Sequence, residues 1–208
     1  MRDDFNPHSH VSLLEVMFFF LGKHSAKIHR VQKIGLMKNG KVVRGAQSRN
    51  MKTRGIEIRF SITGLGSAKA LRYFQLNAKT PEFDKNHRGF IAYLTKNSKR
   101  YVRLLKAASY LLNPVNGLNF TTVRNLILNN SSYVVQDESG IPLRFFSKKG
   151  WKINAYGRYQ GPIHLFRNYK QDTLIEMTQT NRALNFSWGY RGGRDPSKSV
   201  FIVAKPQQ

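Results

Sequence analysis

The sequence predicts an α+β fold, organised as a single domain with a mostly antiparallel sheet and about three or four helices. Three patterns support this prediction: polar and apolar residues alternate along 56–62, an Asn-Gly pair occupies 39–40, and apolar residues recur at three- and four-residue intervals along 90–128. Strand signals come first, helical signals follow, and strand signals return towards the carboxy terminus. That separation is typical of α+β proteins, whereas α/β proteins alternate the two kinds of element.

The amino-terminal third carries strands joined by turns. Segments 31–37 and 42–43 flank an Asn-Gly pair, which accepts the positive φ angles of a tight hairpin turn. Along 56–62 the apolar residues are expected to form one buried face, with the polar residues, Glu57 among them, on the other. A further strand is expected at 71–76. The glycine-containing segment 64–69 lacks the spacing of a phosphate-binding loop, so we expect a turn there.

The middle of the chain favours helices. Apolar spacing predicts two amphipathic helices, within 90–94 and within 102–112, the second closed by Asn113-Pro114. A third helix is expected after Thr121, which is a suitable N-cap residue. Further along, strands are expected at 133–136, 151–159 and 200–204, with a helix near 171–177.

The length and composition are those of a folded domain. A chain of 208 residues can bury one sizeable core, and 40% of its residues are hydrophobic. We therefore expect residues 11–208 to form the single α+β domain and residues 1–10 to be a flexible amino terminus. The longest apolar run, 16–21, is far shorter than the roughly 20 residues of a membrane span, so no transmembrane segment is expected.

Charge is the strongest guide to the partner. The chain has 35 Lys and Arg against 11 Asp and Glu, a formal net charge of +24. Such a field attracts polyanions, and the candidate partners are nucleic acid and an anionic polymer or surface of the cell envelope. Two long segments, 16–56 and 85–136, contain no acidic residue. These segments are the candidate polyanion-binding surfaces.

Cofactors and metals are not expected. The absence of cysteine excludes disulfides, thiolate metal sites and cysteine nucleophiles. A cluster of His8 and His10 with His24 or His29 has the residues to bind a metal, but no acid or thiolate stands at a supporting spacing. We therefore expect no metal site and no cofactor.

The segment 136–140 has the residues most suited to chemistry. Its candidate catalytic residues are Asp137, Glu138 and Ser139, two adjacent carboxylates and a hydroxyl before a glycine. The alternative is a structured turn in which Asp137 accepts backbone N–H bonds and pairs with Arg144. No nucleophile elbow G-x-S-x-G is present, so a hydrolase triad is not expected.

Two groups of cations are candidates for anion binding. The first lies at helical spacing in 96–106, where like charges on one helix face would repel unless an anion binds. The second, in 188–194, places arginines beside Trp188 and Tyr190, and such a mixture can stack on bases or sugars while contacting phosphate. The alternative is a core Trp and Tyr followed by a flexible basic loop. The candidate anion-binding residues are Lys96, Lys99, Arg100, Arg103, Lys106, Arg191 and Arg194.

Three segments carry a family resemblance. They are 104–112, 120–124 and 136–142, which contain the strings KAASYLL, FTTVR and QDESGIP. In this order they resemble a family of uncharacterised bacterial proteins, often exported, with KxASYLL and QD(D/E)SGIP segments. Further similar positions are Trp151, 156–159, 161–163 and 188–190.

The resemblance covers about residues 56 to 204 and implies that this chain corresponds to the carboxy-terminal half of a longer protein. It also implies an extracytoplasmic location, although the chain shows no signal peptide of its own. It implies no activity, cofactor or catalytic residue.

Three classes of function follow. The first is a non-enzymatic, basic polyanion-binding module, and the absence of a known helix-turn-helix, zinc-finger or RNA-recognition signature argues against base-specific recognition. The second is an enzyme of unknown reaction with a site around Asp137-Glu138-Ser139, together with Tyr156 and Tyr159. The third is a structural or scaffold domain whose charge maintains solubility.

Overall fold

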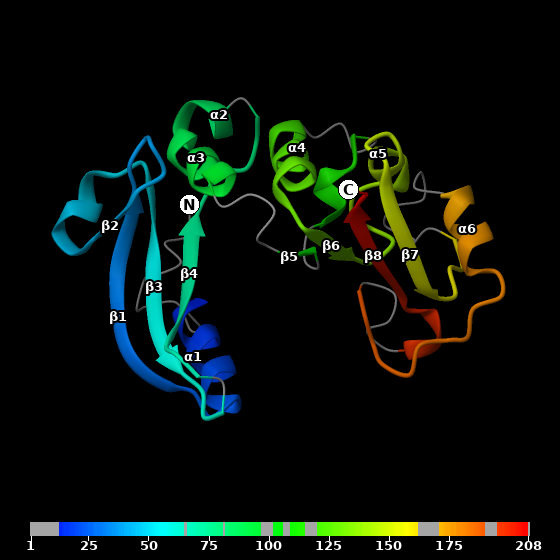
Figure 1. Cartoon of the computed structure of the whole chain (residues 1–208), viewed down its shortest axis with the longest axis horizontal. Coiled ribbons are helices and arrows are strands. Elements are labelled where there is room, and N and C mark those ends of the chain that lie inside the picture. The colour runs from blue at the N-terminus through cyan, green and yellow to red at the C-terminus, as the bar shows by residue number, and fades with distance from the viewer. Residues whose placement is uncertain are drawn as a thin grey trace. The chain divides into compact units, whose positions relative to one another are not determined.

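The chain forms two compact units, Met1–Leu76 and Asn77–Gln208, each built around a four-stranded sheet (Figure 1). The computed structural model describes residues 13–64, 66–80, 82–96, 102–105, 109–114, 120–161, 171–189 and 195–207. Five of the six strand pairings among these residues are antiparallel, which confirms the α+β class with mostly antiparallel strands. The strands form two sheets, where one was expected. That residues 11–208 form a single domain stays a prediction.

The first unit is an antiparallel sheet with the strand order β2-β1-β3-β4. Its strands are β1 (Lys27–Leu36), β2 (Val42–Arg44), β3 (Thr53–Ser61) and β4 (Lys69–Gln75). A 3-10 helix, η1 (Gly45–Asn50), joins β2 to β3. The predicted hairpin is confirmed: Gly40 has φ +80°, and the backbone N–H of Lys41 donates to Asn39 Oδ1 at 3.1 Å. The expected turn also joins β3 to β4.

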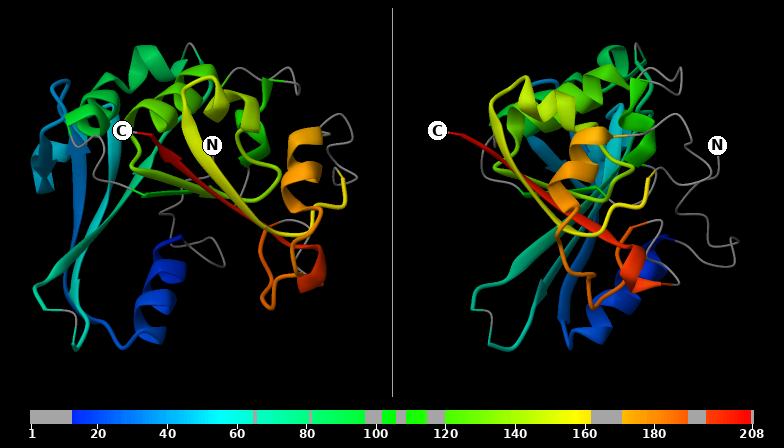
Figure 2. Two further views of the ribbon diagram at one scale, coloured as in Figure 1. Left: turned by 45° about the vertical axis from the view of Figure 1, so that its right-hand side comes forward. Right: turned by 90° about the vertical axis from the view of Figure 1, so that its right-hand side faces the viewer.

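A helix that the sequence analysis did not predict covers one face of this sheet. This is α1 (Leu13–Lys23), and its residues Leu14, Met17, Phe18 and Leu21 form a cluster with Ile56, Ile58 and Phe60 of β3. Figure 2 shows α1 beside the sheet. The alternation that predicted β3 thus gives the strand its buried apolar face, against α1.

The second unit combines a mixed sheet with several short helices. Its strand order is β5-β6-β8-β7, and β5 runs parallel to β6. The elements are α2 (Glu82–Asn86), α3 (Arg88–Lys96), β5 (Val102–Leu105), η2 (Ser109–Leu112), α4 (Thr121–Asn130), β6 (Tyr133–Gln136), α5 (Leu143–Ser147), β7 (Trp151–Gly157), α6 (Asp172–Thr178), η5 (Pro196–Lys198) and β8 (Val200–Pro206). The predicted elements around 90–94, 133–136, 151–159, 171–177 and 200–204 are confirmed.

Helices α4, α5 and α6 cover one face of the second sheet. Apolar residues of the three helices share a core with alternate residues of the strands, and fully buried members include Phe146, Leu174, Val134 and Ile202. Figure 2 shows α4 and α5 on the same side of the sheet. The second unit is therefore a two-layer arrangement of helices on a sheet.

Two local predictions for the second unit were wrong. Of the helix expected at 102–112, the described residues 102–105 form a strand and 109–112 form the 3-10 helix η2. Helical spacing of apolar residues was overridden by pairing with β6, which places Val102 beside Tyr133 and Leu105 beside Gln136. Thr121 is the first residue of α4, and the N-cap position is Phe120, which makes no side-chain capping bond.

No helix within the described part of the chain is long and apolar enough to cross a membrane.

Candidate anion-binding site

A cluster of arginines surrounds one buried carboxylate on the first sheet. The register of β1, β3 and β4 places Gln32, Glu57 and Arg72 directly across from one another. Two positions further along, Arg59 of β3 lies opposite Arg30 of β1, on the same side of the pleat. Together with Arg44 of β2, the residues Arg30, Arg44, Arg59 and Arg72 around Glu57 are called the arginine cluster below.

Glu57 accepts hydrogen bonds from three neighbouring side chains. Arg44 donates from Nε to Oε1 at 3.0 Å and from Nη2 to Oε2 at 3.1 Å. Arg72 donates from Nε to Oε2 at 2.7 Å, and Gln32 donates from Nε2 to Oε1 at 2.8 Å. Arg59 adds an ion pair, with 3.5 Å between its Nε and Oε1. Both carboxylate oxygens are therefore engaged by cations.

The pKa of Glu57 reflects this environment. Burial of the carboxylate acts to raise its pKa, because a charge is costly to remove from water. Hydrogen bonds from Arg44, Arg72 and Gln32 outweigh that effect and lower the pKa from 4.5 to about 2. Glu57 is thus a permanent anion at neutral pH. The alternation along 56–62 predicted that Glu57 lies on the exposed face of β3, which was wrong: its side chain is fully buried beneath the guanidinium groups.

The arginines themselves remain accessible to solvent. The side chain of Arg59 is 53% exposed and that of Arg44 is 39% exposed, and Arg30 is exposed as well. Glu57 is the sole acidic residue in β1, β2, β3 and β4. Four guanidinium groups and one carboxylate leave a clear surplus of positive charge on this face.

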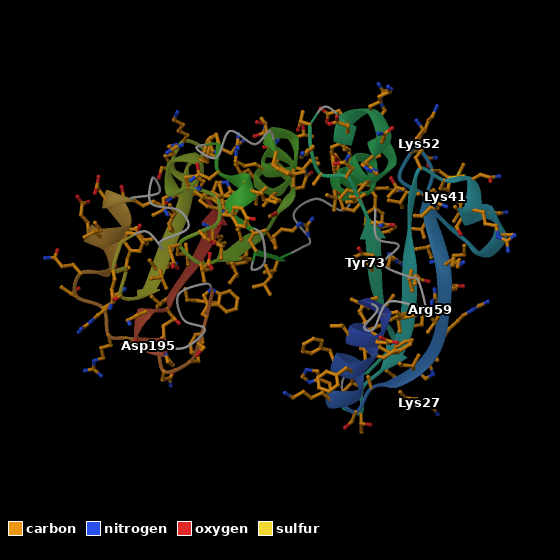
Figure 3. All side chains as sticks on the ribbon, turned by 180° about the vertical axis from the view of Figure 1, so that it is seen from behind. Lys27, Lys41, Lys52, Arg59, Tyr73 and Asp195 are labelled. Carbon is orange, nitrogen blue, oxygen red and sulfur yellow. The ribbon has the colours of Figure 1, made fainter. Side chains whose placement is uncertain are left out.

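Further cations extend along the same sheet. Figure 3 shows Lys52 and Lys41 near one end of it, Arg59 towards the middle and Lys27 near the other end. The three lysines lie within the acid-free segment 16–56, a candidate polyanion-binding surface from the sequence, and Arg59 lies just beyond it. The charge pattern indicated the region, but neither the cluster nor the role of Glu57 followed from it.

The predicted cationic stripe of 96–106 does not lie on one helix. Lys96 is the last residue of α3, whereas Arg103 lies in β5. Arg103 is paired in register with the buried Val134, so its side chain is on the helix-covered face, and its Nη2 atom is buried. The remaining candidates of both groups, Lys99, Arg100, Lys106, Arg191 and Arg194, lie outside the described residues.

The candidate catalytic residues form a buried turn. Asp137, Glu138 and Ser139 are 0%, 3% and 2% exposed. Asp137 Oδ1 accepts hydrogen bonds from the backbone N–H of Ser139 at 2.9 Å and from its hydroxyl at 2.6 Å. This is the Asp-centred turn that the sequence offered as the alternative to catalysis. Arg144 was the expected ion-pair partner of Asp137. Its guanidinium group stacks over the ring of Phe145, with 5.2 Å between the guanidinium carbon and the ring centroid.

Two glutamines hold this turn in place. The side-chain amide of Gln136 donates to the carbonyl of Ile141 at 2.7 Å and accepts from its backbone N–H at 2.9 Å. Gln171 donates to the carbonyl of Glu138 at 2.9 Å and accepts from the N–H of Leu143 at 3.0 Å. Satisfied buried polar groups of this kind fix a backbone conformation.

The two tyrosines that were grouped with this segment lie in different environments. Tyr159 is buried, and its backbone N–H donates to Thr178 Oγ1 at 3.1 Å. Tyr156 is 49% exposed and pairs with Phe201 across β7 and β8. Tyr156 therefore lies on the sheet face opposite to the one that Gln136 shares with Ile202.

Within the described residues, no group of three His, Asp or Glu side chains is arranged to hold a metal ion. His8 and His10, named in the sequence analysis, lie outside that part of the chain.

Comparisons with known proteins leave the chain without an assigned relative: no family, no curated protein and no solved structure matches it.

Proposed function

We propose that this protein is a non-enzymatic polyanion-binding module and that the arginine cluster of the first sheet is its principal phosphate-contacting site. The observation that carries the proposal is that one buried carboxylate holds three guanidinium groups in place on a face with no other acid in its strands. Arginine side chains suit this role because the planar guanidinium group matches the geometry of phosphate oxygens.

Glu57 supports binding by organising the cations beforehand. A free arginine side chain loses rotamer freedom when it binds an anion, at a cost of up to about 2 kcal/mol. Hydrogen bonds to Glu57 hold Arg44 and Arg72 in place before a ligand arrives, so that cost is largely met during folding. Arg30 and Arg59, paired across β1 and β3, repel one another, and a bound phosphate would relieve that repulsion.

The buried state of Asp137, Glu138 and Ser139 supports this function over the enzymatic alternative. A catalytic carboxylate has to come within hydrogen-bond distance of its substrate. All three residues are buried, and Asp137 and Ser139 are hydrogen-bonded to one another.

The test is the salt dependence of binding to a 20-base-pair duplex DNA. The double variant Arg30→Gln/Arg59→Gln should lower the magnitude of the log–log salt slope by about 2, since each phosphate contact in duplex DNA contributes about 0.9. The matched control is Lys148→Gln/Arg182→Gln, which removes two exposed cations of the second unit that lie outside both acid-free segments. The control should change the slope by less than about 1.

Two outcomes would overturn the proposal. One is a wild-type affinity that does not change between low and moderate salt. The other is an equal change of slope in both double variants, which would mean that total charge and not the arginine cluster governs binding. Poly(glycerol phosphate), used as a second probe, distinguishes an envelope polymer from nucleic acid as the partner.

A further inference from the structure

The second sheet has one face that no described helix covers. Burial alternates along its strands: residues on the helix-covered face are buried or half-buried, and those on the opposite face are half-buried or exposed. We call this second surface the open face. Its residues, placed there by the strand register, are Val102, Leu104, Tyr133, Val135, Lys152, Asn154, Tyr156, Phe201, Val203 and Lys205.

Aromatic rings gather at one end of the open face. Phe201 of β8 lies opposite Tyr156 of β7, with 6.2 Å between the ring centroids. Phe186 and Trp188, which precede β8 in the chain, add edge-to-face contacts to Phe201. Their ring centroids lie 6.1 Å and 5.2 Å from that of Phe201. Tyr156 and Phe186 are 49% and 45% exposed, so parts of this aromatic cluster are accessible to a ligand.

A second aromatic position lies further along the same face. Tyr133 of β6 is 36% exposed, and the Nζ atom of Lys205 lies 5.6 Å from the centroid of its ring. Lys205 follows Phe201 by four residues on β8, a separation of roughly 13 Å at about 3.3 Å per residue. The open face thus presents aromatic side chains at two places, one beside Phe201 and the other beside Lys205 of β8.

Cations accompany the rings, and acids are absent. Lys152 and Lys205 lie directly opposite one another on β7 and β8, and both are exposed. The four strands contain no Asp or Glu. Two like charges at paired positions repel, and a ligand with negative charge would relieve that repulsion.

We propose that the open face binds single-stranded nucleic acid, with bases stacked on Tyr133 and Tyr156 and backbone phosphates near Lys152 and Lys205. Exposed aromatics with neighbouring cations on an open sheet are the combination by which proteins bind single strands with little sequence preference. A neutral apolar partner would gain nothing from the paired lysines, and a duplex keeps its bases stacked on one another and unavailable. The inference identifies the polyanion and adds a second surface to the proposed function.

The experiment compares two fluorescent oligomers of equal length and charge, dT20 and an abasic deoxyribose phosphate 20-mer. The wild-type protein should bind dT20 at least about tenfold more tightly, because stacking adds to the phosphate contacts. Tyr133→Ala/Tyr156→Ala should lose that preference and bind the two oligomers alike, while Tyr133→Phe/Tyr156→Phe should keep it because phenylalanine still stacks. Phe19→Ala is the control, since Phe19 is a 69% exposed aromatic of α1 in the first unit.

Each outcome separates this inference from the proposed function. If the wild-type protein binds both oligomers equally, or if the alanine variant, shown to be folded by its circular dichroism spectrum, retains the preference, the base-stacking inference is overturned. Binding of the abasic oligomer does not depend on base stacking, since that oligomer offers only phosphates, and its weakening in Arg30→Gln/Arg59→Gln is the result that the proposed function requires. A protein that binds neither oligomer would overturn both.

Discussion

The carboxylate of Glu57 and the guanidinium group of Arg72 meet at 2.7 Å across β3 and β4, although the glutamate side chain is fully buried. Burial of a carboxylate is favourable only where hydrogen bonds and opposite charges replace its hydration. Here three arginines and Gln32 do so, and the partly exposed arginines reduce the desolvation cost on their side of the contact. One acidic residue therefore organises three arginines of the first unit.

Glu57→Gln should destabilise the first unit by about 2 to 3 kcal/mol. The glutamine amide replaces one acceptor oxygen of the carboxylate with an NH2 group, which is a donor. An arginine N–H group that donates to that oxygen then faces another donor, and the hydrogen bond is lost. Chemical denaturation measures the change in the free energy of unfolding. Glu176→Gln, at an exposed acidic position of α6, serves as the control and should stay within about 0.5 kcal/mol of the wild type.

The stability of the protein should depend on pH between about 4.5 and 2. Because the pKa of Glu57 is about 2 in the folded chain, the unfolded chain takes up a proton first as the pH falls. The stabilisation is fully present above the unfolded pKa and is lost as the pH falls through the folded pKa, by up to about 3 kcal/mol. The measurement is the difference in unfolding free energy between wild type and Glu57→Gln. That difference should shrink over this range, and a constant difference would contradict the assignment.

Asp137→Ala should lower the melting temperature by a few degrees. The substitution removes the acceptor of two hydrogen bonds from Ser139, a loss of about 1 to 2 kcal/mol in a buried turn. Differential scanning calorimetry provides the measurement. A variant with an unchanged melting temperature but altered ligand turnover would instead favour a catalytic role for this segment.

Gly189→Ala should cost about 2 kcal/mol or more, because two effects add. Gly189 has φ +69°, a conformation that side chains disfavour, and a Cβ atom there would overlap the carboxylate of Asp137. Gly150→Ala is the matched control: its φ is +67°, but nothing lies within 4 Å of the added Cβ. The control should lose about 1 kcal/mol, which is the backbone effect alone. Equal losses in the two variants would show that Asp137 does not restrict this position.

Much of the fold was predictable from local patterns. The Asn-Gly turn and the alternation around Ile58 identified β1 to β3, since both signals depend on a few neighbouring residues. The helix expected at 102–112 was wrong because a four-residue strand such as Val102–Leu105 carries too few residues to show its own period. Its parallel pairing with β6 involves residues about 30 positions away, which no local pattern contains.

The candidate sites were less predictable. Acid-free segments identified the region of the arginine cluster, but its members come from four strands, and sequence spacing does not bring Arg44, Glu57 and Arg72 together. The segment 136–140 was predicted as a candidate turn, but its burial was not predicted, because turns of this composition are usually exposed. Tyr133 and Tyr156 carried no signal that linked them to one face.

By itself, the sequence determined the class of the fold, the strong positive charge, and the absence of disulfide and thiolate chemistry, because these depend on composition and on local periodicity. The tertiary structure decided which charges are neighbours and which face of each sheet remains uncovered. Both depend on strand register. A shift of one residue would move every side chain of a strand to the other face of the sheet, since successive side chains point to opposite faces. In the register observed here, Glu57 is buried among arginines on the first sheet, and Tyr156 is exposed on the second.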